Sequence, residues 1–262
     1  MSPLRRDGNR LVCQCGRAYP IVDDVPIVVQ DLAGWAQSEG PSALRRSDVA
    51  PEVVELLAVD AASRRNRRLR AAYASTGGDL PGWIASTIAG APGPVLEIGS
   101  GPGHAGTVRL DLNLDLLRAG PRPDRLVETA DGVVVPVGAA VVAHAADPPF
   151  EAGAFETVVL ANVLDSCDDP AVVLAQADAL VAPGGRLVVT CAYAFDDTIT
   201  RPAHRFDEQQ LMAALTGRAD FCGYGLDCRL DGPPMDLEWV LNPGPRTRHV
   251  HRVQVLTATR PR

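Results

Sequence analysis

The stretch VLEIGSGPGHAG at residues 95–106 decides the fold. Its first four residues predict a short buried β strand that carries Glu97. Gly99, Gly101 and Gly103 follow in a G-x-G-x-G loop. Glycines directly after a strand let the backbone approach a bound ligand closely. Because nicotinamide, flavin and adenosylmethionine sites all use such a loop, other motifs must distinguish between them.

From Val95 onward, strand-like apolar segments alternate with helical ones. The segments are VLEI, VRLDL, VVAHA, TVVLA, AVVLAQADALV and RLVVTCA. This alternation predicts a mostly parallel sheet covered by helices. The C-terminal stretch DLEWVLNPGPRTRHVHRVQVLTATR predicts two strands joined by an Asn-Pro-Gly-Pro turn, and therefore an antiparallel hairpin at the edge of the sheet.

The sequence before this region predicts two smaller parts. Residues 11–29 contain two short β segments separated by a turn at Asp23-Asp24, which indicates a small β appendage. Residues 34–90 have helical apolar spacing and predict a flank or lid. We therefore expect three parts, with boundaries at 1–33, 34–90 and 91–262.

The stretch VRLDLNLDLLRAG at 108–120 places Asp111 near the end of a second strand, where a carboxylate can accept hydrogen bonds from two hydroxyls. In a competing register, 104–118 is a helix, 125–128 is the second strand, and Glu128 supplies the carboxylate. We favour Asp111, because the residues after Glu128 form a poor helix and would leave the crossover to the next strand without one. Residues 125–142 then form an inserted β-rich excursion.

Two further motifs follow in order. The segment 144–170 contains Asp147 followed by Pro-Pro-Phe, and 180–195 contains the end of a helix, a Pro-Gly-Gly turn and a strand. In order and content, residues 95–195 resemble the class I S-adenosylmethionine-dependent methyltransferase family. The resemblance implies an α/β fold with a Rossmann-like, mostly parallel seven-stranded sheet and a C-terminal antiparallel hairpin. The small N-terminal β appendage and the helical flank complete the predicted architecture.

The resemblance also implies a cofactor, S-adenosylmethionine, and the residues that hold it, with Asp147 at the adenine amine. The predicted cofactor-binding residues are Glu97, Gly99, Gly101, Gly103, Asp111, Asp147 and Asn162. Because open α/β sheets bind ligands at the carboxyl ends of their strands, the residues that follow the fourth and fifth strands are catalytic candidates. These candidates are Asn162, Asp165 and Tyr193.

The chain departs from the family between Gly103 and Asp111. Only seven residues separate these two positions, whereas the family places a whole helix there. We therefore expect that helix to be missing or reduced. A second departure is Glu156, at a position where the family has Asp. Both residues carry a negative charge.

The N-terminal stretch CQCGRAYPIVDDVPIV resembles the second half of a zinc-ribbon-like segment that precedes some methyltransferase domains. Only Cys13 and Cys15 of the two cysteine pairs are present. Two thiolates do not complete a four-ligand zinc site, and the other cysteines fall in the segments predicted for the catalytic domain. We expect no metal ion.

Composition restricts the function. All 25 basic residues are arginine, which excludes a P-loop lysine and a Schiff-base lysine. The net charge of −7 disfavours nucleic acid as a partner. The apolar runs are too short for a membrane span, and the first residues do not form a signal peptide, so we expect a cytoplasmic protein without a membrane partner.

Together these patterns predict methyl transfer from S-adenosylmethionine to a small-molecule substrate, whose nucleophilic atom the sequence does not specify. Two other functions stay open. One is a methyltransferase that acts on RNA, which the zinc-ribbon resemblance suggests and the acidic charge disfavours. The other is a catalytically silent protein that binds or regulates a partner, which the short segment before Asp111 suggests.

Overall fold

The structure is a computed structural model that describes residues 4–38, 76–121, 125–128, 134–137, 140–197, 199–244 and 246–262. The middle of the predicted helical flank, residues 39–75, lies outside the described residues. The chain divides into two compact units. The first comprises the described residues within 1–75, 100–144 and 242–247, and the second comprises 76–99, 145–241 and 248–262. The predicted boundaries at 33 and 90 stay predictions.

The sheet of the second unit is parallel in its middle. Strand β6 (Val95–Ile98) pairs in parallel with β11 (Phe155–Ala161), which pairs in parallel with β12 (Val181–Cys191). The Pro-Gly-Gly turn interrupts the register of β12, because Phe155 faces Val181 but Thr157 faces Arg186. The α/β class and the largely parallel sheet are confirmed.

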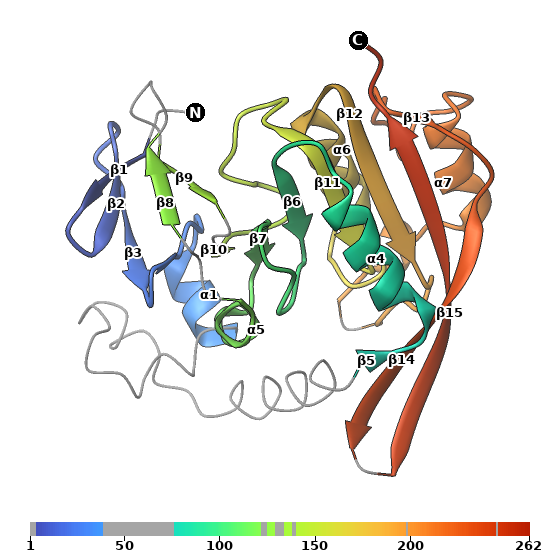
Figure 1. Cartoon of the computed structure of the whole chain (residues 1–262), viewed down its shortest axis with the longest axis horizontal. Helices are drawn as coiled ribbons and strands as arrows, with labels where there is room; N and C mark the ends of the chain where they lie inside the picture. Colours follow the sequence, from blue (N-terminus) through green and yellow to red (C-terminus); the bar gives the residue numbers. More distant parts are fainter. Residues whose placement is uncertain are drawn as a thin grey trace. The chain divides into compact units, whose positions relative to one another are not determined.

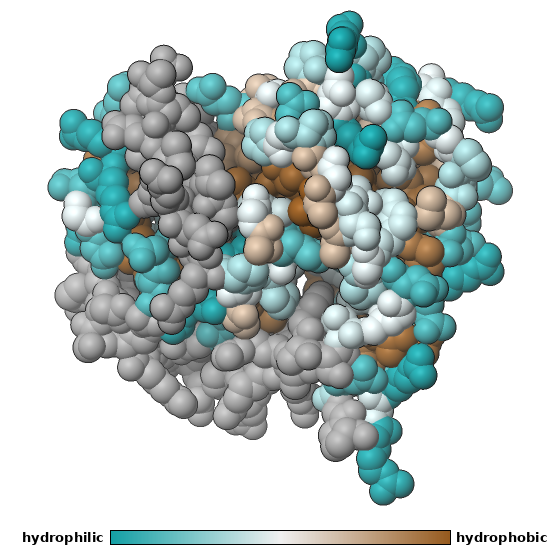
Figure 2. All heavy atoms as spheres, viewed as in Figure 1, coloured by the Kyte–Doolittle hydropathy of each residue, from teal (hydrophilic) through white to brown (hydrophobic). Residues whose placement is uncertain are grey.

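An antiparallel hairpin follows the parallel strands, as expected. It consists of β14 (Met235–Gly244) and β15 (Thr247–Thr259), and β15 pairs antiparallel with β12. The predicted Asn-Pro-Gly-Pro turn is misplaced, since Asn242, Pro243 and Gly244 continue β14. The two-residue strands β5 (Thr76–Gly77) and β13 (Arg229–Leu230) pair with β14 and β15. The outer end of the hairpin is hydrophilic (Figure 2).

Helices cover both faces of this sheet (Figure 1). On one face, α4 (Asp79–Ala89) packs on the strands through an apolar cluster. Its buried members are Leu80, Ile84, Val95, Val159, Val188, Val253 and Val255. On the other face lies α6 (Pro170–Leu180), which Asp169 caps by accepting a hydrogen bond from the N–H of Val172 at 3.2 Å. Helix α7 (Glu208–Leu215) begins with a capping box formed by Asp207 and Gln210.

The first unit begins with a four-stranded antiparallel sheet, two strands more than we predicted. Its strands are β1 (Leu4–Asp7), β2 (Arg10–Cys13), β3 (Ala18–Val22) and β4 (Val25–Pro26). The predicted turn is confirmed, because Asp23 and Asp24 join β3 to β4 with φ of 54° and 60°. Short polar residues tolerate this left-handed backbone, which a two-residue hairpin turn requires.

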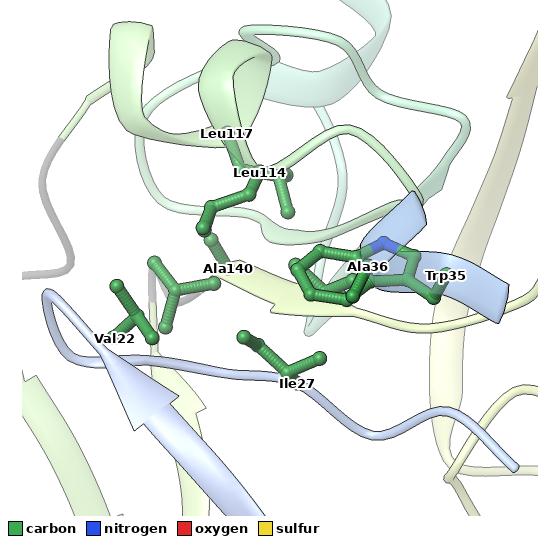
Figure 3. Packing of buried hydrophobic residues seen from close by; sticks show 9 residues of the cluster. Val22, Ile27, Trp35, Ala36, Leu114, Leu117 and Ala140 are labelled. Atoms are coloured by element: carbon green, nitrogen blue, oxygen red, sulfur yellow. The ribbon is translucent and has the colours of Figure 1, made fainter. Parts of the chain in front are cut away.

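The first unit also contains a parallel strand pair. Strand β7 (Val108–Asp111) pairs with β10 (Ala140–Val142), and α5 (Leu114–Ala119) begins three residues after β7 ends. The first unit has its own apolar core, in which α1 (Leu32–Ser38) and the N-terminal strands pack on α5 and β10 (Figure 3). Its buried members are Val22, Val25, Ile27, Trp35, Ala36, Leu114, Leu117, Ala140 and Val142.

The predicted register of β7 is correct and the rival register is wrong. Residues 108–111 are a strand rather than part of a helix, and Asp111 is its last residue. In the competing register, residues 125–128 were the second strand of the parallel sheet. They form strand β8 (Arg125–Glu128), which pairs antiparallel with β9 (Val134–Val137) in a separate two-stranded sheet. This β8–β9 pair confirms the first part of the β-rich excursion predicted for 125–142, whereas residues 140–142 form β10 and pair in parallel with β7.

A buried arginine holds the segment between Gly103 and β7. The described residues 99–107 contain turns and no helix, as the departure from the family led us to expect. Arg109, 1% exposed, donates from Nη1 to the carbonyls of Pro102 (2.9 Å) and Leu117 (3.0 Å) and from Nη2 to that of Pro121. One guanidinium therefore fixes both the glycine loop and the end of α5.

Gly120 lies where a side chain would break this arrangement. A Cβ at Gly120 would lie 1.8 Å from the Pro102 carbonyl oxygen and 2.2 Å from Arg109 Nη1. We expect Gly120→Ala to lower the free energy of unfolding by at least about 2 kcal/mol, measured by chemical denaturation.

Gly82 provides the matched control. It lies inside α4, and among the described residues no atom lies within 4 Å of a Cβ built there. Gly82→Ala should raise the free energy of unfolding by about 0.5–1 kcal/mol, because alanine favours helix. Equal stabilities of the two variants would contradict the packing described for Gly120.

Candidate functional site

The carboxylate of Asp111 organises the glycine loop of the first unit. Its Oδ2 accepts a hydrogen bond from the N–H of Gly101 at 2.8 Å, and its Oδ1 accepts one from the N–H of Asn113 at 2.8 Å. Gly101 and Gly103 have φ of 56° and 61°, a left-handed backbone that favours glycine. The N–H of Gly103 donates to the Ser100 carbonyl at 2.9 Å, which closes the loop.

Two opposing effects act on the Asp111 carboxyl. Burial raises its pKa, and the hydrogen bonds from the N–H groups of Asn113 and Gly101 oppose this rise. The backbone of Leu112 acts in the same direction as these two N–H groups. A carboxylate has about four lone-pair positions on its two oxygens, so Asp111 keeps acceptor capacity beyond these backbone groups.

In the second unit, predicted residues gather where β6 and β11 end. Glu97 is buried in β6 and lies opposite Val159 of β11. Gly99 has a φ of 63°, and a Cβ there would lie 2.3 Å from Cγ2 of Val163. A side chain at position 99 would thus displace the segment that begins with Asn162.

Asn162 is held in a left-handed conformation, with a φ of 55°. Its N–H donates to the carbonyl and to Oγ1 of Thr190, both at 3.0 Å, and Thr190 Oγ1 donates back to Asn162 Oδ1 at 3.0 Å. Positive φ in a residue other than glycine costs energy, and such residues concentrate at functional sites. Thr190 on β12 therefore fixes the residue that follows β11.

Asp165 is buried and holds the backbone that carries Tyr193. Its Oδ2 accepts hydrogen bonds from the N–H groups of Ala192 at 3.2 Å and Ala194 at 3.1 Å, on either side of Tyr193. Tyr193 is itself left-handed, with a φ of 54°. The sequence predicted that Asp165 and Tyr193 share a site, and hydrogen bonds join the segment after β11, which carries Asp165, to the segment after β12, which carries Tyr193.

A chain of hydrogen bonds fixes the Tyr193 phenol. Its hydroxyl donates to Gln254 Oε1 at 2.6 Å, and Gln254 Nε2 donates to Glu208 Oε1 at 2.5 Å. The ring packs edge-on against Phe206, with 5.7 Å between centroids. Burial, with further contributions from Cys191 and Glu208, raises the pKa of the phenol. Tyr193 is therefore a neutral hydrogen-bonding group at physiological pH.

Two thiols of this region, the partly buried Cys167 and the buried Cys191, are poor nucleophiles. Burial raises the pKa of Cys167 to about 12 and raises that of Cys191 as well, with negative charge at nearby aspartates adding to the effect. Thiols with raised pKa stay protonated, and the thiolate is the reactive form. The chemistry of this edge of the sheet therefore depends on oxygen and amide groups.

Asp147 lies in the segment between β10 and β11. It is exposed in a bend after β10, and Phe150 nearby packs edge-on against Phe155 of β11 at 5.1 Å between centroids.

Three residues that were not predicted from the sequence support the predicted ones: Thr190, Gln254 and Glu208. Gln254 had a recognisable signal, since it is a single polar residue in the apolar run VQVL of β15 and is 4% exposed. A buried amide in a strand needs hydrogen-bond partners, and here they are Tyr193 and Glu208. Thr190 lies in an ordinary strand sequence and Glu208 in an ordinary helix sequence, so neither had a comparable signal.

Among the described residues, none of the helices has the length and apolar character required to traverse a lipid bilayer. The parallel strands of the second unit, and the left-handed glycines and the acid at the end of β7 in the first unit, are features of a Rossmann-like α/β protein. Residues 62–255 match the sequence profile of a methyltransferase-domain family, which covers more than half of the chain. The protein belongs to this family, the class I S-adenosylmethionine-dependent methyltransferases.

A search of solved structures finds matches of low identity. A SAM-dependent methyltransferase from Methanosarcina mazei is 19% identical, with 68% of this chain and 97% of that chain covered and a TM-score of 0.45. A protein of echinomycin biosynthesis that converts a disulfide bond into a thioacetal group is 18% identical (69% and 82% covered, TM-score 0.45). The [4+2]-cyclase SpnF is 13% identical (70% and 80% covered, TM-score 0.46). No curated protein matches the sequence.

S-adenosylmethionine is the cofactor of this family, and the residues present fit it. The Asp111 carboxylate at the end of β7 is an acceptor group that suits hydroxyl donors. The left-handed Gly99, Gly101 and Gly103 leave the backbone accessible to a ligand. Gly101, Gly103 and Asp111 belong to the first unit, and Glu97, Gly99, Asp147 and Asn162 to the second.

The contacts of Asp165 give a testable expectation. We expect Asp165→Asn to lower the free energy of unfolding by about 1–3 kcal/mol, because an amide accepts the two N–H bonds more weakly than a carboxylate. In the same variant, hydrogen exchange at the backbone amides of Ala192 and Ala194 should be faster than in the unmodified protein. Asp220→Asn, at an exposed acid, should change stability by less than about 0.5 kcal/mol. Unchanged exchange at both alanines would refute the role of Asp165.

Proposed function

We propose that the protein transfers the methyl group of S-adenosylmethionine to a small-molecule substrate. The observation that carries the proposal is the Asp111 carboxylate, which the N–H groups of Gly101 and Asn113 fix at the end of β7. The cofactor supplies an activated methyl group on a positively charged sulfur. The protein binds, orients and desolvates the reactants, and correct placement supplies much of the acceleration.

Each predicted residue has a distinct proposed role. Asp111 accepts the ribose hydroxyls, Asp147 accepts the adenine amine, and the backbone of the glycine loop faces the rest of the cofactor. Glu97 and Asn162 complete the binding set. Tyr193, together with Asn162, contacts the methyl acceptor.

The geometry suggests how Tyr193 acts. Its proton is donated to Gln254, so the phenol oxygen offers its lone pairs to an N–H or O–H of the acceptor. The raised pKa keeps the phenol neutral, so we assign it an orienting role rather than that of a general base. The two backbone bonds at Asp165 lead us to propose that this residue positions Tyr193, in place of the direct role that the sequence suggested.

A small-molecule substrate also agrees with the charge of the chain. The net charge of −7 repels a polyanion, which argues against the RNA methyltransferase alternative. A second candidate function, a catalytically silent binding protein, is favoured by one observation. The described residues 99–107 contain no helix after the glycine loop.

Asp111 and Glu128 provide a matched pair of variants for the cofactor site. We expect Asp111→Asn to weaken S-adenosylhomocysteine binding by at least about tenfold, because one charge-assisted hydrogen bond contributes about 1.5–3 kcal/mol. Glu128→Gln should change the dissociation constant by less than about twofold. Isothermal titration calorimetry measures both, with the unfolding midpoint of each variant as a folding control. If Glu128→Gln weakened S-adenosylhomocysteine binding and Asp111→Asn did not, Asp111 would be refuted as the ribose acid.

Methyl transfer itself is tested with S-adenosylmethionine that carries a labelled methyl group. The protein is incubated with this cofactor and separate pools of small metabolites, RNA and protein. We expect label in the small-molecule pool, and we expect Tyr193→Phe to lower kcat by at least about tenfold without changing cofactor affinity. Label in RNA would instead support the RNA alternative. Cofactor binding without label in any pool would support the silent protein.

A further inference from the structure

The tip of the β2–β3 hairpin carries two cysteines in one tight turn. The N–H of Gly16 donates to the carbonyl of Cys13 at 2.9 Å, and the N–H of Cys13 donates to the carbonyl of Arg17 at 2.8 Å. Gly16 has a φ of 84°. This combination is a β turn followed by a left-handed glycine, which is a common three-residue hairpin loop. Cys13 occupies the first position of the turn and Cys15 the third.

The turn brings the two thiols close to each other. The N–H of Cys15 donates to Sγ of Cys13 at 3.3 Å, so the Cys13 side chain folds back over the turn toward Cys15. Alpha carbons two residues apart are separated by at most about 7.6 Å, and a turn shortens this distance toward the window of about 4.4–6.8 Å that disulfides span. Cys15 is exposed and Cys13 is partly buried.

The surroundings favour a reactive Cys15. The side chain of Cys13 and then the backbone at Arg17 lower the pKa of the Cys15 thiol, and the charge of the Arg17 guanidinium acts in the same direction. Tyr19 of β3 interacts in turn with Arg17. Cys167, Cys191 and Cys228 show the opposite behaviour, because burial raises the pKa of each. An exposed thiol with a lowered pKa and a second thiol beside it is the usual arrangement of a redox-sensitive cysteine.

We propose that Cys13 and Cys15 form a peroxide-reactive dithiol, in which Cys15 is the attacking thiolate and Cys13 the resolving thiol. The Cys15 thiolate attacks one oxygen of hydrogen peroxide, the O–O bond breaks, and hydroxide leaves, so that Cys15 becomes a sulfenic acid. The sulfur of Cys13 then attacks Sγ of Cys15, the S–O bond breaks, and the departing hydroxide takes the Cys13 proton as water. Overall, two thiols and one hydrogen peroxide give one disulfide and two waters.

The experiment uses the reduced full-length chain treated with hydrogen peroxide and then digested with trypsin. Cleavage after Arg10 and Arg17 releases residues 11–17, which contain Cys13 and Cys15 and no other cysteine. We expect the mass of this peptide to fall by two hydrogens and to return after reduction. In Cys13→Ser, the reaction should stop at a Cys15 sulfenic acid that dimedone traps.

Cys222 provides the internal control. It is also exposed in a tight turn, closed by backbone hydrogen bonds of 2.8 and 3.0 Å between Phe221 and Tyr224, but no cysteine lies two residues from it in the sequence. Iodoacetamide should alkylate Cys15 several-fold faster than Cys222, and this advantage should shrink in Cys13→Ser. An unchanged mass of peptide 11–17, or equal alkylation rates for Cys15 and Cys222, would overturn the proposal. Neither result bears on methyl transfer.

Discussion

The glycine loop has no helix behind it in the described residues 99–107, so side-chain hydrogen bonds must hold it, and two residues of β7 supply them. Asp111 accepts from the backbone of Gly101, and Arg109 donates to the carbonyl of Pro102. Successive side chains of a strand point to opposite faces, so residues 109 and 111 share one face. The position of the glycine backbone and the orientation of the proposed ribose carboxylate thus depend on the same strand.

A similar dependence recurs at the strand ends of the second unit. Asn162 and Tyr193 both adopt positive φ, and a neighbouring element holds each in that conformation: Thr190 bonds to Asn162, and Asp165 bonds on both sides of Tyr193. Hydrogen bonds that maintain a costly backbone conformation fix side-chain direction tightly. This precision suits a reaction that is accelerated mainly by placement.

Apolar patterns predicted most of the sheet, because buried parallel strands must be continuously apolar. They located β6, β7, β11, β12 and α6, and they put Asp111 at the end of its strand. They missed the partners of Asn162 and Tyr193, since Thr190 and Gln254 come from strands distant in sequence and only tertiary pairing brings them near. They also misplaced the final hairpin turn, because Pro243 and Gly244 usually end strands, whereas here they extend β14.

The most direct test of the central claim is thermal unfolding of the full chain with and without S-adenosylmethionine or S-adenosylhomocysteine. At a ligand concentration 100 times the dissociation constant, a specific binder gains ~2.7 kcal/mol. For a chain of this size, that gain corresponds to a rise of roughly 5–10 °C in the unfolding midpoint. We predict such a rise with both ligands. An unchanged midpoint, together with no heat of binding by calorimetry, would contradict the assignment of a working cofactor site.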